Sequence, residues 1–88
     1  MGIMWELVSF AQAQLRRICL ESLTKGPKTP AAIAKLSKED LPHVSRALRE
    51  LTEKGLVECL TPNAAKNRIY GITPKGKEIV KKLKEMEQ

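Results

Sequence analysis

The sequence predicts a mainly α-helical chain with one small β-hairpin, which is an α+β fold. Apolar residues recur at helical spacing in several segments, and two short segments rich in branched and aromatic residues flank the turn-rich interval 61–67. A length of 88 residues is enough for one modest apolar core, so we expect a single domain over residues 1–88.

A long first helix is predicted over residues 3–23. Its apolar positions, among them Val8, Leu15 and Cys19, recur with the period of an α-helix. Residues 25–27, with the sequence Lys-Gly-Pro, end this helix, because they combine a basic last turn, a residue that accepts a left-handed backbone and a proline that cannot continue it.

Residues 29–55 predict two further helices joined by a short turn. Thr29 can accept a backbone N–H as an N-cap, and Pro30 suits the first helical position, where its missing donor costs nothing. After the polar turn 37–40, the second of these helices is expected at about 41–54. Four apolar residues are predicted to form its inner stripe: Leu41, Val44, Leu48 and Leu51.

Residues 56–73 predict a hairpin, and residues 75–88 predict the last helix. The two hairpin segments are joined by a long tip that is rich in turn-forming residues. In the last helix an apolar stripe that includes Ile79 and Val80 alternates with lysines at helical spacing, which indicates one buried face.

The predicted order is helix, helix, helix, hairpin, helix, which is the order of a winged helix-turn-helix. The segments PKTPAAIAKL, HVSRALRELTEKGLVE and IYGITPKGKEIV resemble MarR-type and related archaeal and bacterial winged-helix transcriptional regulators over about residues 15–83. The resemblance implies a DNA-binding regulator that represses by occluding a promoter. One departure is the turn at 37–40, with the sequence Ser-Lys-Glu-Asp, where such proteins often have a glycine and a branched apolar residue.

The charge of the chain favours polyanionic partners. Sixteen Lys and Arg stand against ten Asp and Glu, which leaves a formal net charge of +6. With the inner stripe turned to the core, a rotation of about 100° per residue places a basic and small-residue face outward on the helix at about 41–54. We expect this recognition helix to enter a major groove of double-stranded DNA through five residues: Pro42, His43, Ser45, Arg46 and Arg49.

The interval 61–68 would then be the wing. Lys66, Asn67 and Arg68 lie where a hairpin tip can reach phosphates or an adjacent minor groove. Thr29 and Lys38 flank the helix-turn-helix and are further candidates for phosphate contacts, because free N–H groups at a helix start also favour anions.

The first helix carries a second apolar stripe that one small core cannot cover. Ile3, Leu7 and Phe10 follow the spacing i, i+4, i+7 and point away from the main stripe in an ideal helix. We therefore predict a homodimer, whose interface is expected to contain Ile3, Trp5, Leu7, Phe10, Leu83 and Met86.

Enzyme and metal chemistry find no support in the residue pattern. One histidine, one aspartate and two cysteines with no short spacing build neither a catalytic triad nor a metal-ligand cluster, so we expect no catalytic residue, metal or cofactor. No signal peptide or membrane span is expected, and the predicted location is the cytoplasm. The sequence leaves a small-molecule effector open.

Two alternative functions stay open at this point. A winged helix that binds proteins would use apolar rather than basic residues. A non-specific architectural or RNA-binding module would bind nucleic acid without sequence preference and with a steep dependence on salt.

Overall fold

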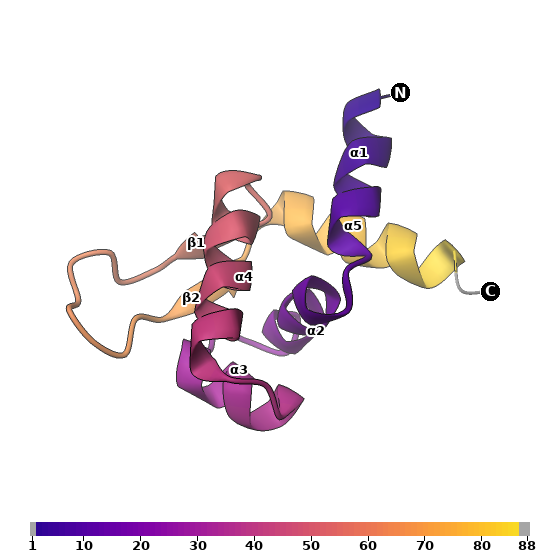
Figure 1. Cartoon of the computed structure of the whole chain (residues 1–88). Coiled ribbons are helices and arrows are strands. Elements are labelled where there is room, and N and C mark those ends of the chain that lie inside the picture. Colours follow the sequence, from indigo (N-terminus) through magenta and orange to yellow (C-terminus); the bar gives the residue numbers. More distant parts are fainter. Residues whose placement is uncertain (1, 87–88) are drawn as a thin grey trace.

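The computed structural model describes residues 2–86, with side chains from Trp5 onward. The elements follow the order α1 (Gly2–Ala11), α2 (Gln14–Leu23), α3 (Pro30–Ser37), α4 (Leu41–Glu53), β1 (Val57–Cys59), β2 (Tyr70–Ile72) and α5 (Pro74–Met86), as Figure 1 shows. This order confirms the predicted α+β winged helix-turn-helix. Within residues 2–86, no helix is both long and apolar enough to cross a bilayer.

The prediction of one long helix over 3–23 is wrong, because this segment folds as two helices. Ala13, just before α2, has φ −55° and ψ 131°, an extended conformation, and α1 and α2 point in different directions (Figure 1). Neither Gln12 nor Ala13 is a helix breaker. Tertiary packing supplies the break, since α1 packs on α5 while α2 packs on α4 and α5.

The helix-turn-helix begins with the predicted cap. The Thr29 hydroxyl oxygen accepts the Ala32 N–H at 3.2 Å, and Pro30 follows at the first helical position. After α3, Lys38 adopts φ 60° and ψ 27°, a left-handed conformation that turns the chain toward α4. Lys38 thus takes the conformation for which related proteins often use glycine at this turn.

The inner stripe of α4 differs from the prediction at one position. Val44, Leu48 and Leu51 are fully buried, but Leu41 is 48% exposed and Ala47 is buried in its place. At about 100° per residue, Leu41 and Ala47 lie about 60° to either side of Val44. The buried direction is therefore rotated toward Ala47, and Leu41 falls on the edge of the helix.

The strands of the hairpin are shorter than predicted, and a residue from outside the hairpin pairs with the second strand. Its strands pair antiparallel with Val57 opposite Ile72 and Cys59 opposite Tyr70. Lys28 forms a bridge on the other side of Tyr70, with N–H to carbonyl distances of 3.0 Å and 2.8 Å in the two directions. This bridge fixes the start of α3 against the base of the wing, and a single paired residue leaves no periodic signal in the sequence.

Helix α5 lies very close to the hairpin. The Thr73 hydroxyl accepts the Gly76 N–H at 3.0 Å and donates to the Gly55 carbonyl at 2.7 Å. A Cβ atom on Gly76 would meet the Leu56 carbonyl oxygen at 2.1 Å and Ile72 Cγ1 at 2.7 Å. Gly76 is therefore needed inside the helix for close approach, a requirement that the residue pattern did not predict.

Two residues predicted for the dimer interface lie in the core of the chain itself. Leu7 is 7% exposed and Leu83 is 2% exposed, so the prediction that Leu7 points away from the core is wrong. The break before α2 is the reason, because it lets α1 pack across α5 (Figure 1). The remaining predicted residues have different positions: Phe10 is half-buried, Trp5 and Met86 are exposed, and the Ile3 side chain lies outside the described residues.

Candidate nucleic-acid interface

The outer face of α4 is an exposed surface with two arginines. Pro42, His43, Ser45, Arg46 and Arg49 are all exposed, as predicted from the helical wheel. Arg46 and Arg49 form no hydrogen bond or ion pair with other described residues, while His43 Nδ1 lies 3.7 Å from a carboxylate oxygen of Asp40. Both guanidinium groups are thus available to a partner outside the chain.

The arginines of α2 differ from those of α4 because both have partners within the chain. Arg16 binds Glu50 with an N–O distance of 3.0 Å, and Arg17 binds Glu21 at 3.2 Å. Fixing an arginine in an ion pair lowers its availability to an external anion. Arg68 also has a partner, the Ala64 carbonyl, so the two arginines of α4 are the ones for which the described residues provide no partner.

A groove of about 550 Å³ lies between the start of α3, helix α4 and the wing. It brings together five of the predicted site residues: Thr29, Ser45, Arg49, Asn67 and Arg68. The predicted residues Lys38, Pro42, His43, Arg46 and Lys66 do not line it. Ser45 and Arg49 line the groove and also belong to the outer face of α4, so the two form one surface. Figure 1 shows the wing extending away from the helices beside α4.

The wing loop is held by its own hydrogen bonds. Arg68 Nε donates to the Ala64 carbonyl at 2.8 Å, and the Thr61 hydroxyl accepts the Ile69 N–H at 2.9 Å. Asn67 has φ 54°, a conformation that asparagine tolerates better than most residues. Lys66 is exposed at this tip.

The structure adds groove residues that the sequence interpretation missed. Ala31 lines the groove, and its N–H has no carbonyl one turn earlier in α3 to bind. Leu41, Cys59 and Tyr70 also line the groove and contribute apolar surface to it. A residue pattern along one element gives no signal for them, because the groove is formed by three elements that are separate in sequence.

The two cysteines have different environments. Cys19 is fully buried, and burial raises the pKa of its thiol to about 11. Cys59 is half-buried in the groove, and both cysteines are free. Within the described part of the chain, no three His, Cys, Asp or Glu side chains gather where they could hold a metal ion.

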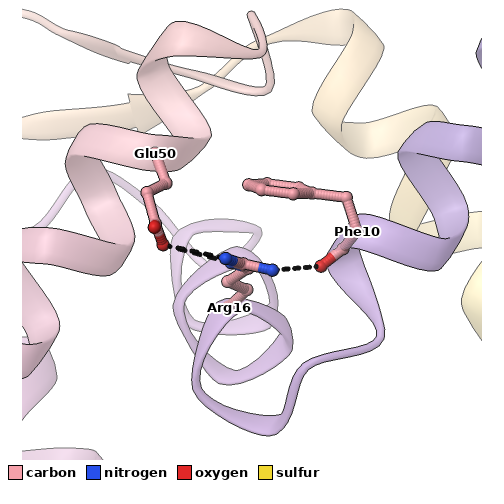
Figure 2. A network of polar contacts seen from close by, with 3 residues as sticks. All are labelled: Phe10, Arg16 and Glu50. Atoms are coloured by element: carbon pink, nitrogen blue, oxygen red, sulfur yellow. Dashed lines mark hydrogen bonds and ion pairs between the residues drawn. The ribbon is translucent and has the colours of Figure 1, made fainter.

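A polar network connects α4 to the break between α1 and α2 (Figure 2). Arg16 donates from Nε and Nη2 to one Glu50 carboxylate oxygen, at 3.2 Å and 3.0 Å, and from Nη1 to the Phe10 carbonyl at 3.1 Å. Its Cζ atom also lies 3.9 Å from the centroid of the Phe10 ring. Helix α4 is thereby fixed to the last turn of α1.

The element order and the exposed basic face of α4 define a winged helix-turn-helix protein. The chain is 32% identical over 79 residues to YdgG of Bacillus subtilis (strain 168), an uncharacterised HTH-type transcriptional regulator. The match covers 86% of this chain and 50% of that protein, so the chain spans half the length of this relative. No protein-family model matches the chain.

Solved structures give the same result. A MarR family transcription regulator superposes with a TM-score of 0.74 at 29% identity, covering 83% of this chain and 50% of that one. A homodimeric winged helix-turn-helix DNA-binding domain from Mycobacterium bovis, described as a possible ArsR-family regulator, superposes with a TM-score of 0.68 at 26% identity, covering 96% and 75%. The similarity to MarR-type and related winged-helix transcriptional regulators, predicted from the sequence, is confirmed.

Proposed function

We propose that this chain binds double-stranded DNA and regulates transcription. The observation that carries the proposal is the outer face of α4, where Arg46 and Arg49 are exposed and form no ion pair with the described residues. An α-helix fits the major groove, and an arginine can donate two hydrogen bonds to O6 and N7 of guanine. In this arrangement α4 reads bases, and His43, Ser45 and Pro42 complete its contact surface.

The groove beside α4 offers phosphate-binding groups on two of its sides, although the acidic residue Glu53 also lines it. Thr29 and Ala31 are on its α3 side, and Asn67 and Arg68 are on its wing side. Backbone N–H groups at a helix start and arginine side chains both bind phosphate, and such contacts fix the register of a protein on the duplex. Lys66 at the wing tip reaches the backbone or the adjacent minor groove, and Lys38 adds a phosphate contact at the start of α4.

The proposed active form is a homodimer that represses by occlusion of a promoter. One of the similar solved structures is a homodimeric DNA-binding domain, and two copies related by a two-fold axis present two recognition helices. Such an arrangement requires an approximately palindromic operator with half-sites about one helical turn apart.

Selection from a random duplex library, followed by competition shift assays at two salt concentrations, tests the proposal. We expect enrichment of a palindromic sequence that random duplex displaces poorly at the higher salt concentration. Equal displacement by random duplex would assign the chain to the non-specific architectural class. No binding to duplex at low salt would assign it to the protein-binding class instead.

A further inference from the structure

Glu50 is a negative charge on the recognition helix itself. It lies four residues after Arg46 in α4, and side chains at i and i+4 are neighbours on a helix surface. Without another partner, a carboxylate at this position can either pair with Arg46 or repel phosphate. Either event lowers the positive potential of the surface that we propose binds DNA.

The structure directs this carboxylate to another helix. Glu50 accepts two hydrogen bonds from Arg16 of α2, and it forms no ion pair with Arg46. The guanidinium of Arg16 is itself held in place, because its Nη1 donates to the Phe10 carbonyl and its plane lies over the Phe10 ring. Figure 2 shows Arg16 between the two partners.

We propose that Arg16 is a positioning residue for DNA recognition, which holds the Glu50 carboxylate away from Arg46 and keeps the charge of Arg46 available to the duplex. The inference rests on the proposed function of α4. Arg16 touches no DNA in this arrangement and acts through Glu50. The network has a mechanical effect as well, since it fixes α4 to the last turn of α1.

Two substitutions separate the electrostatic role from a mechanical one. Arg16→Met releases a charged Glu50, whereas Glu50→Gln removes the charge, and both weaken the same contact between α2 and α4. A purely mechanical role predicts that both variants lose DNA affinity. The electrostatic role predicts that their effects on DNA affinity have opposite signs, although both lower the melting temperature.

The chain offers controls with the same change in charge. Arg17→Met removes one positive charge from the same helix, and Glu21→Gln removes one negative charge, both in the ion pair next to Arg16. Fluorescence anisotropy with one labelled duplex of mixed sequence and about 30 base pairs, three helical turns, measures the affinity of each variant. Circular dichroism verifies that each variant is folded at the temperature of the titration.

We expect Arg16→Met to bind this duplex about two- to fivefold more weakly than Arg17→Met at about 0.1 M salt. Glu50→Gln should bind at least as tightly as Glu21→Gln. The double variant Arg16→Met/Glu50→Gln should return to within about twofold of the affinity of the unchanged chain, while its melting temperature stays low.

Other results overturn the inference. Equal affinities of Arg16→Met and Arg17→Met, or a loss of affinity in Glu50→Gln relative to Glu21→Gln, would show that the carboxylate is not what Arg16 controls. If Arg16→Met does not fold, the DNA affinities of Glu50→Gln and Glu21→Gln still test whether the Glu50 carboxylate opposes DNA binding. Failure of the unchanged chain to bind duplex would instead overturn the proposed function and the inference together.

Discussion

Lys38 occupies a backbone conformation that favours glycine. Its φ of 60° and ψ of 27° place it in the left-handed region, which costs a residue with a Cβ about 1–2 kcal/mol. The sequence predicted the turn at 37–40 but gave no sign of this conformation, because lysine is not a typical residue for it. Lys38 adopts this conformation as the C-cap of α3, where its N–H donates to the Ala34 carbonyl.

Replacing Lys38 with glycine should therefore stabilise the fold. The relief of left-handed strain exceeds the extra entropy of glycine in the unfolded chain, so we expect the free energy of unfolding to rise by up to about 1 kcal/mol. Lys35→Gly, inside α3, is the control and should lower it by about 1 kcal/mol. Urea unfolding measures both, and equal losses in the two variants would contradict a left-handed Lys38.

Arg46 and Lys66 are predicted to contribute to DNA binding in different ways. Arg46→Ala should lower specific affinity by about 1–3 kcal/mol and relax base preference at one position of each half-site, because a bidentate guanine contact is lost. Lys66→Ala should weaken all sequences nearly equally and reduce the salt slope by about one unit. Competition titrations with operator and random duplex measure both effects, and identical behaviour of the two variants would refute the assignment of α4 to base reading.

At the scale of elements, the sequence predicted the features that depend on residues close together along the chain. The cap at Thr29 follows from residue type and position alone, and the structure confirms it. The break at Ala13 and the burial of Leu7 depend on how α1 packs against α5, which no periodicity within residues 3–23 records. The exposed arginines of α4 were predictable from the helical wheel, whereas the ion pair between Arg16 and Glu50 joins residues far apart in sequence.

The close contact between α5 and the hairpin makes a prediction for Gly76. Gly76→Ala places a Cβ atom 2.1 Å from the Leu56 carbonyl oxygen, which belongs to rigid backbone, so α5 must move. We expect a loss of about 3 kcal/mol or more in the free energy of unfolding, at the upper end of overpacking effects. Thermal unfolding measures it, with the exposed Lys77→Ala in the same turn expected within about 0.5 kcal/mol of the unchanged chain. A similar change in both variants would contradict the close approach.

At the scale of the whole molecule, exposed apolar residues on α1 and α5 predict self-association. Trp5 is 63% exposed and Met86 is 45% exposed, on two helices that pack against each other. Burying such side chains against a second copy is worth about 1.5–3 kcal/mol for each fully covered one. We therefore expect a dimer at concentrations on the order of 10 µM, and a monomer for Trp5→Glu/Met86→Glu.

The control for this prediction adds the same charge at equally exposed apolar positions elsewhere. Leu36 is 64% exposed and Leu60 is 46% exposed, so Leu36→Glu/Leu60→Glu matches the test variant in charge and exposure. Light scattering should find this control dimeric. A monomeric unchanged chain, or a test variant that stays dimeric, would exclude an interface built on Trp5 and Met86.

The contacts of Arg16 connect the helix that is expected to bind a second copy with the helix that is proposed to bind DNA. One guanidinium contacts both the last turn of α1, at the Phe10 carbonyl, and the recognition helix, at Glu50. If a partner copy docks on α1 and shifts α4 through this contact, then DNA that favours the shifted position of α4 must also strengthen the association of the two copies. Thermodynamic linkage requires the two factors to be equal. Operator DNA should therefore lower the dissociation constant of the dimer by the same factor by which dimerisation lowers the dissociation constant for DNA. The Arg16 side chain would contribute to this coupling.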